Sequence, residues 1–66
     1  MDFGQLRQLV AIADEETMSA AADVLRMPQP TLSRSIRRLE DDFGFALFDR
    51  VGRKVTLNDA GRTAVE

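Results

Sequence analysis

The chain has 66 residues, of which 44% are hydrophobic and 30% charged, with a formal net charge of -2. This length allows one domain, and the balance of apolar and charged residues is that of a globular chain rather than a disordered one. Cysteine and histidine are both absent, which excludes disulfides, zinc fingers and enzymes that use either residue as nucleophile or base. The longest early apolar run, Leu9–Ala13, is too short for a signal peptide or a membrane span, which predicts a soluble intracellular protein.

Two helices are expected within the first 25 residues. Apolar residues at three-to-four spacing from Phe3 to Ala13 predict an amphipathic helix, which the acidic cluster 14–16 closes. Thr17 is a good N-cap for a second helix. The apolar residues of that helix keep the same spacing: Met18, Ala21, Ala22 and Leu25. Because this inner face is mostly alanine, another element is expected to approach it closely.

A third helix is expected over residues 29–43, after the short turn 26–28. Its apolar residues are predicted to stack on one side: Leu32, Ile36, Leu39 and Phe43. Gly44 is placed to end the helix as the left-handed residue that follows the last turn.

The pattern changes after Gly44. The segment "LFDRVGRKVTL" predicts two short strands, 47–50 and 54–57, around residues 51–53. A primed two-residue turn is not expected, because Val51 resists positive backbone angles, and the turn type stays open. Asn58 is expected to cap a last helix that starts at Asp59 and still runs at Glu66, which indicates a piece of a larger protein.

Positive charge gathers in two short segments, although the sequence pI is about 5.0. Residues 26–38 sum to +4 and residues 50–54 to +3, whereas residues 1–25 and 39–49 each sum to -4. Arg34 has a like charge, Arg38, four residues on, so an external anion would stabilise this helix. A phosphate backbone would meet both basic segments if the hairpin lies beside the third helix.

A plainer interpretation of the basic helix is a solvated face. Arg37 and Arg38 each have an acid four residues on, Asp41 and Asp42, which allows weak pairs within the helix.

The pattern predicts two helices joined by a short turn, the second of which is polar and cationic at its start. A helix-turn-helix uses this arrangement to present a recognition helix to the major groove of DNA. In such a groove Gln29 can pair with adenine, Arg34 with guanine and Ser33 with either base. Pro30 or the methyl group of Thr31 can pack on a thymine methyl. Side-chain chemistry therefore allows sequence reading by this helix.

The chain resembles the amino-terminal DNA-binding domain of the LysR-type bacterial transcriptional regulators. The family's alanine pair, Gln-Pro-x-Leu-Ser run, arginine-rich helix and Leu-Phe-x-Arg motif are similar to the stretch "AAADVLRMPQPTLSRSIRRLEDDFGFALFDR". The family's wing and the entry to its linker helix are similar to "GRKVTLNDAG". The resemblance implies a mainly α, winged helix-turn-helix fold with three helices, a short two-stranded β-hairpin wing and the start of a linker helix. Residues 1–57 would form the DNA-binding domain, and residues 58–66 would begin the linker or dimerisation helix.

The resemblance also implies function. It predicts sequence-specific binding of double-stranded DNA, with helix 29–43 in the major groove and wing 47–57 on the backbone or minor groove, and no enzyme activity. Together with the charge pattern it gives ten expected DNA-binding residues: Gln29, Pro30, Thr31, Ser33, Arg34, Arg37, Arg38, Arg50, Arg53 and Lys54.

Family members are cytoplasmic bacterial proteins that bind interrupted palindromes with T and A at the ends. They assemble as homodimers or larger oligomers through the linker helix, and they have no membrane partner. Their small-molecule effector binds a separate C-terminal domain, so no cofactor or metal is expected in this fragment.

Three departures from the family pattern stand out. Pro28 replaces the usual capping residue, which removes a side-chain cap typically worth ~1 kcal/mol, and Pro30 lessens this loss because it lacks an N–H. Ala20 replaces a polar or basic residue, so one possible phosphate contact is missing. Asn58 stands where threonine is usual and is an equally good cap.

Other functional readings are weaker. The acidic cluster 14–16 is more typical of a solvated helix end than of a metal or catalytic site, and Met18 and Met27 are more typical of packing than of a cofactor site. "VGR" lacks the spacing and the lysine-serine ending of a phosphate loop. One alternative stays open: a protein-interaction or dimerisation winged helix whose arginine face meets an acidic partner, which a weak response to salt would reveal.

Overall fold

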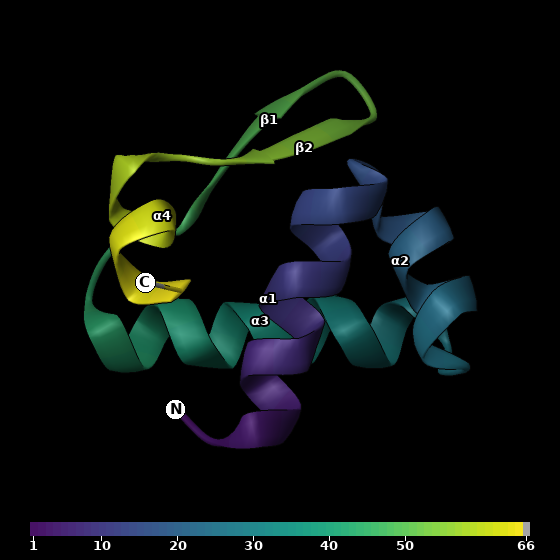
Figure 1. Ribbon diagram of the computed structural model, residues 1–66, viewed down its shortest axis with the longest axis horizontal. Coiled ribbons are helices and arrows are strands. Elements are labelled where there is room, and N and C mark those ends of the chain that lie inside the picture. Colours follow the sequence, from purple (N-terminus) through teal and green to yellow (C-terminus); the bar gives the residue numbers. More distant parts are fainter. Residues whose placement is uncertain (66) are drawn as a thin grey trace.

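The structure, a computed structural model, describes residues 1–65. Within this range the chain forms four helices and one antiparallel hairpin. Figure 1 shows α1 crossing α3, the hairpin at the top of the view, and α4 at the left between the hairpin and α3. The elements in chain order are α1 (Phe3–Glu15), α2 (Met18–Leu25), α3 (Gln29–Phe43), β1 (Phe48–Val51), β2 (Lys54–Leu57) and α4 (Asp59–Val65). The predicted mainly α fold with a two-stranded wing is confirmed.

Side-chain caps set the starts of the first two helices. Asp2 and Gln5 form a capping box, in which Asp2 Oδ1 accepts the Gln5 N–H at 2.8 Å and Gln5 Oε1 accepts the Asp2 N–H at 3.1 Å. Thr17 Oγ1 accepts the Ala20 N–H at 3.1 Å, which confirms the predicted cap of α2. The cap at Asp2 was not anticipated from the sequence.

Helix α3 starts without a side-chain cap at Pro28, as expected from the sequence, and ends at Gly44 with φ 81°. The predicted position of Phe43 is wrong. Phe43 is exposed, and its ring stacks on that of Phe45 with centroids 5.7 Å apart. The cause is its place in the last turn, where α3 passes beyond the core that Leu32, Ile36 and Leu39 share.

The hairpin turns more tightly than the sequence indicated. Val51 pairs with Lys54, so the loop contains only Gly52 and Arg53. The expectation against a two-residue turn was wrong because Val51 is the last strand residue, and Gly52 takes the positive φ of 60°. The first strand begins at Phe48, one residue later than predicted.

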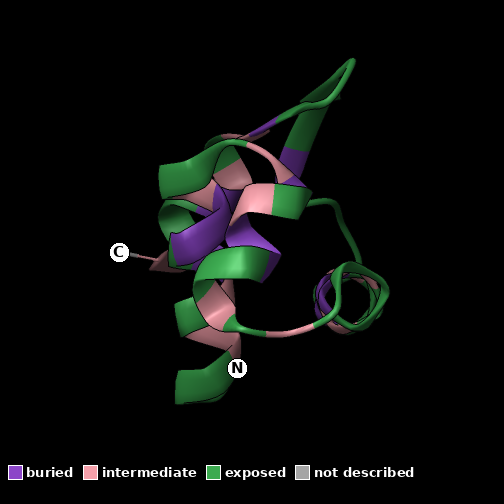
Figure 2. Ribbon diagram, turned by 90° about the vertical axis from the view of Figure 1, so that its right-hand side faces the viewer, coloured by how far each residue is buried: buried purple, intermediate pink, exposed green. Residues whose placement is uncertain are grey.

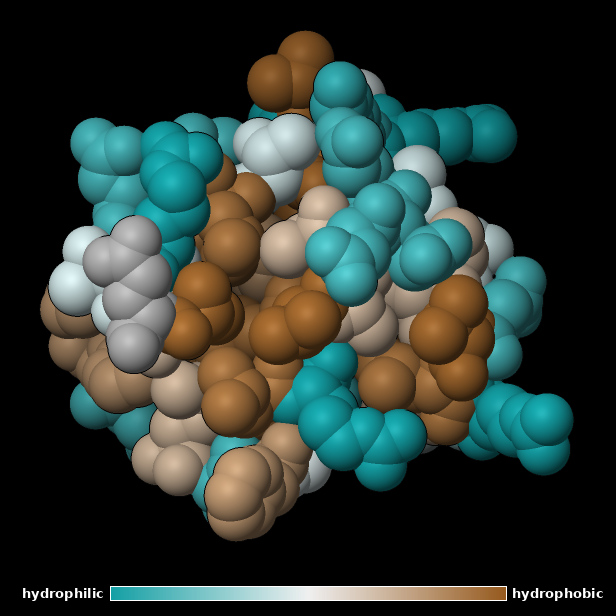
Figure 3. Space-filling view, in the orientation of Figure 1, coloured by the Kyte–Doolittle hydropathy of each residue, from teal (hydrophilic) through white to brown (hydrophobic). Residues whose placement is uncertain are grey.

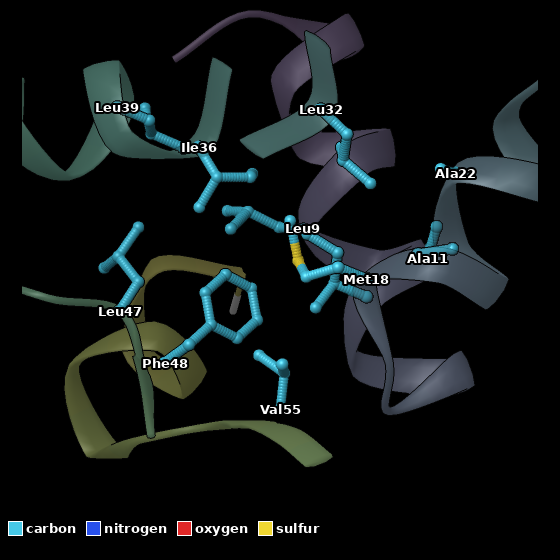
Figure 4. Packing of buried hydrophobic residues seen from close by; sticks show 12 residues of the cluster. Leu9, Ala11, Met18, Ala22, Leu32, Ile36, Leu39, Leu47, Phe48 and Val55 are labelled. Atoms are coloured by element: carbon cyan, nitrogen blue, oxygen red, sulfur yellow. The ribbon is translucent and has the colours of Figure 1, made fainter. Parts of the chain in front are cut away.

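All three helices of the helix-turn-helix and the wing contribute to one core. Figure 4 shows Phe48 and Val55 pointing from the wing toward Leu9 of α1 and Met18 of α2. The buried residues are Leu9, Ala11, Ile12, Met18, Ala21, Ala22, Leu32, Ile36, Leu39, Leu47, Phe48 and Val55. Burial of each large side chain stabilises the fold by about 1.5–3 kcal/mol, so the wing is anchored to the helices by its own apolar residues.

The expectation that the alanine face of α2 packs closely is confirmed, since Ala21 and Ala22 are buried against the core. The amphipathic pattern of α1 was less reliable at two positions: Phe3 is 85% exposed and Val10 43% exposed. The first turn of α1 extends past the other elements, as Figure 1 shows, so Phe3 has nothing to pack against.

The base of the wing and α4 are tied together. Asn58 caps α4 as predicted, because its Oδ1 accepts the Gly61 N–H at 2.8 Å, and its Nδ2 donates to the Ala46 carbonyl at 2.8 Å. A Cβ at Gly61 would overlap the carbonyl oxygen of Leu47. Glycine therefore lets α4 sit directly on the wing base. The expected continuation of this helix to Glu66 lies outside the described residues.

Candidate nucleic-acid interface

The residues predicted to read DNA lie on the outer side of α3. We call this set the reading face; it consists of Gln29, Pro30, Thr31, Ser33, Arg34, Arg37 and Arg38. Ser33 is half-buried and the other members are exposed. Figure 2 shows α3 nearly end-on, with its buried side toward the other helices and its exposed side toward solvent. The structure thus brings all seven residues to one accessible helix surface.

Within residues 1–65, the arginines of the reading face have no acidic partner. The ion pairs expected between Arg37 and Asp41 and between Arg38 and Asp42 are not formed, because the ion pairs within residues 1–65 are Lys54–Glu16 and Arg62–Asp59. The side chains of Arg34, Arg37 and Arg38 are exposed to solvent instead. The positive charge of α3 therefore remains available to an external anion.

Helix α1 helps to fix the rotation of α3. Ser35 Oγ of α3 donates a hydrogen bond to Gln8 Oε1 of α1 at 2.5 Å, and the two residues are 27 positions apart in the chain. A shallow groove between the two helices is lined by Gln5, Thr31, Arg34, Ser35 and Arg38. Gln5 and Gln8 were missed by the sequence analysis, because a glutamine on the first helix carries no signal of what it meets in the fold.

The wing arginines face a hollow beside the start of α3. Arg50 pairs across the hairpin with the buried Val55, so it lies on the side of the wing that faces the helices. The hollow has a volume of about 570 Å³ and is lined by Thr17, Met18, Ser19, Gln29, Arg50, Gly52, Arg53 and Val55. The two wing arginines therefore share one concave surface with Gln29, the first residue of α3.

Lys54 is placed differently from the two wing arginines. Its Nζ lies 3.1 Å from Glu16 Oε2, at the end of α1. Arg50 and Arg53, in contrast, form no ion pair within the part of the chain that is described. The structure therefore divides the three expected wing cations into two free arginines and one paired lysine.

A second surface of different character covers α1 and α4. Figure 3 shows apolar side chains gathered over these helices, in the view in which α3 lies behind α1. Exposed apolar residues near the start and middle of α1 are Met1, Phe3 and Val10, and Ala64 and Val65 of α4 are half-buried. We call this the α1–α4 surface. It lies away from the reading face and carries none of its arginines.

Residues 1–65 contain neither a membrane-spanning helix nor a cluster of metal-ligating side chains. No helix there combines the length and the apolar character that crossing a bilayer requires. No three acidic side chains in the same range come together as metal ligands would.

The chain is similar to known transcriptional regulators over its whole length. A family model described as bacterial regulatory helix-turn-helix protein, lysR family, matches residues 3–62. The transcriptional regulator ClcR of Pseudomonas putida is 46% identical over 66 residues, which are 100% of this chain and 22% of that regulator. The transcriptional dual regulator OxyR of Escherichia coli K12 is 42% identical over the same length and is likewise covered to 22%. The chain thus spans about a fifth of the length of these relatives.

Solved structures agree with this similarity. The DNA-binding domain of BenM in complex with benA site 1 DNA matches 98% of this chain and 76% of that chain, with a TM-score of 0.90 and 37% identity. The corresponding domain of CbnR in complex with DNA matches 98% of this chain and 75% of that chain, with a TM-score of 0.89 and 37% identity. In both, the similar chain was solved bound to DNA.

Proposed function

We propose a function for this chain from its family, because it belongs to the lysR family of bacterial regulatory helix-turn-helix proteins. Residues 1–57 are proposed to form the DNA-binding domain of a transcriptional regulator and to bind a specific DNA sequence. Its curated relatives are transcriptional regulators rather than enzymes. The observation that carries the proposal is the reading face of α3, whose arginines form no ion pair within residues 1–65 and which begins beside the hollow that Arg50 and Arg53 line.

Helix α3 is proposed to enter the major groove with its first two turns against the bases. Gln29 and Arg34 are long enough for bidentate contacts, to adenine and guanine respectively, and Ser33 accepts either base. Pro30 and Thr31 offer apolar surface for a thymine methyl. Arg37 and Arg38 lie one turn further along, where phosphates flank the groove, and are proposed to contact the backbone.

The wing is proposed to contact the DNA backbone or the adjacent minor groove. Arg50 and Arg53 form no ion pair within residues 1–65 and line a hollow that Gln29 of α3 also borders, so a duplex that touches the start of α3 would also reach them. Phosphate contacts of this kind fix orientation and add affinity without reading sequence. Lys54 belongs to the same basic segment, but unlike the two arginines it is paired with an acid, Glu16.

The remaining proposals concern the whole regulator. Residues 58–66 are proposed to begin a linker helix through which two copies dimerise, so that two α3 helices meet the halves of an interrupted palindrome. A small-molecule effector would bind outside residues 1–65, and a regulator of bacterial DNA would act in the cytoplasm. The apolar α1–α4 surface supports the dimer, because it places unpacked apolar side chains beside the start of that linker helix.

Fluorescence anisotropy tests the proposal with labelled duplexes. One duplex carries an interrupted palindrome with T and A at its ends, a second carries its scrambled sequence, and each is titrated at several salt concentrations. We expect tighter binding to the palindrome and a log–log salt slope of about -0.9 for each phosphate contacted. Equal binding to both duplexes with little response to salt would contradict DNA reading and favour a protein-contact module.

A further inference from the structure

Glu16 adopts a backbone conformation that its side chain disfavours. It follows α1 with φ 66°, in the left-handed region that L side chains rarely adopt and that glycine occupies most easily. Its N–H donates to the Ile12 carbonyl at 2.8 Å and so closes α1. Glycine would make this backbone contact at lower conformational cost. Any contribution of the Glu16 side chain therefore comes from its contacts outside α1.

The contacts of Glu16 lead to the wing. Its carbonyl oxygen accepts the Val55 N–H at 2.7 Å, and its carboxylate Oε2 lies 3.1 Å from Lys54 Nζ. One residue at the end of α1 therefore holds two successive residues of β2, one through the backbone and one through an ion pair. The strand that it holds carries Val55 opposite Arg50, so the contact fixes the place of Arg50 at the hollow.

The same contact changes the charge that the wing offers to DNA. Lys54 faces a carboxylate, whereas Arg50 and Arg53 have no ion-pair partner in residues 1–65. A neutralised lysine adds little to phosphate attraction, and phosphate attraction supplies nearly all sequence-independent affinity. The pair thus lowers sequence-independent binding while it holds the wing.

From these contacts we propose that Glu16 is a positioning residue for the wing, and that Lys54 clamps the wing to α1 instead of contacting phosphate. The proposal rests on the DNA binding proposed above. As a consequence, Arg50 and Arg53 are the only wing cations that contact the DNA backbone, because Lys54 stays paired with the Glu16 carboxylate.

A double-mutant cycle tests the clamp in the DNA-binding assay. The variants are Glu16→Gln, Lys54→Gln and both together, with Glu15→Gln as the matched control, because Glu15 is an exposed acid of the same helix end and forms no ion pair in the described range. In the native background Lys54→Gln should leave the affinity for either duplex within about twofold and the salt slope unchanged.

Glu16→Gln should have the opposite effect, because it frees Lys54. We expect about 2- to 5-fold tighter binding of the scrambled duplex and a slope steeper by about 0.9, and adding Lys54→Gln should reverse both changes. Glu16→Gly should reproduce this DNA phenotype without lowering the melting temperature, since glycine relieves the left-handed backbone. A clamp that merely supported folding would not give this combination.

Two results in this assay would overturn the proposal. The first is a Lys54→Gln variant that binds both duplexes at least threefold more weakly with a slope flatter by about 0.9, which would make Lys54 a phosphate contact. The second is a Glu16→Gln variant that behaves like Glu15→Gln.

Hydrogen exchange at the Val55 amide tests the positioning without DNA. Glu16→Gln and Lys54→Gln should each lower the protection of this amide several-fold, and Glu15→Gln should not. Unchanged protection in both variants would overturn the positioning role. If the native chain failed to bind either duplex, the proposed function would be wrong, and the exchange result would still decide whether the clamp exists.

Discussion

The reading face of α3 and the wing are both basic, but they are held in place by different means. Helix α3 is seated on the core by three buried side chains, and the Ser35–Gln8 hydrogen bond fixes its rotation. The wing is a two-stranded hairpin, an element that is marginal in isolation, and it depends on Phe48, Val55 and the contacts of Glu16. Base reading needs side chains on a rigid element, whereas phosphate contact tolerates adjustment. The difference supports the proposed roles, in which α3 discriminates sequence and the wing adds sequence-independent affinity.

Arg34→Ala breaks this division on the helix side and should have the largest effect. Loss of a bidentate base contact should cost about 1–3 kcal/mol on the palindrome, or roughly 5- to 150-fold in affinity, with a smaller loss on the scrambled duplex. Paired titrations by fluorescence anisotropy measure the ratio of the two affinities. Arg7→Ala is the control, because Arg7 is an exposed arginine of α1 and lies outside the basic segments 26–38 and 50–54. An unchanged affinity ratio would show that Arg34 does not read bases.

Gly61→Ala acts at the base of the wing. The added methyl group would overlap the Leu47 carbonyl oxygen and crowd Leu57, so α4 and the wing base have to separate. Overpacking of this kind should lower the free energy of unfolding by about 1–3 kcal/mol. The control is Gly4→Ala in α1, where the new Cβ would meet only Asp2 Oδ1 at 3.4 Å. Thermal unfolding should show a loss for the first variant only, and equal melting temperatures would contradict the close approach.

Arg53→Ala tests the wing side of the comparison. Loss of one exposed phosphate contact should weaken both duplexes alike, by about 0.2–1 kcal/mol, and flatten the log–log salt slope by about 0.9. The measurement is a salt series with both duplexes. A selective loss on the palindrome would instead make the wing a reader of sequence.

Phe3→Ser changes the α1–α4 surface and should have the smallest effect on DNA. Phe3 is 85% exposed and lies outside the basic segments 26–38 and 50–54. The affinity of the variant for a half-site duplex should therefore stay within about twofold of the native affinity. Sedimentation should show weaker self-association, because an exposed apolar ring is lost. A large loss of half-site affinity would mean that the α1–α4 surface also contacts DNA.

Much of the fold could be predicted because local signals agreed with each other. Short-range chemistry explains four of these features: the helix cap at Thr17, the helix end at Gly44, the helix cap at Asn58 and the buried residues of α3. The tight turn was missed because Val51 was read as a turn residue, although it completes the strand and leaves the positive φ to Gly52.

The contacts that tune the interface could not be predicted in the same way. Glu16 and Lys54 are 38 positions apart, and no local pattern marks an acid that ends one helix as the partner of a strand lysine. The Ser35–Gln8 hydrogen bond is likewise long-range. The exposure of Phe43 depends on where the core ends, which periodicity does not show. The sequence thus predicts which residues carry charge, and packing decides which of those charges remain free.

An NMR titration of the labelled chain with the palindromic and the scrambled duplex, at low and raised salt, tests the central claim most directly. The account predicts amide shifts over residues 29–38 and 50–53, with the helix shifts larger for the palindrome, the wing shifts similar for both duplexes, and all of them reduced by salt. Shifts confined to residues 3–13 and 59–65 would place the contact on the α1–α4 surface and would contradict DNA reading by α3.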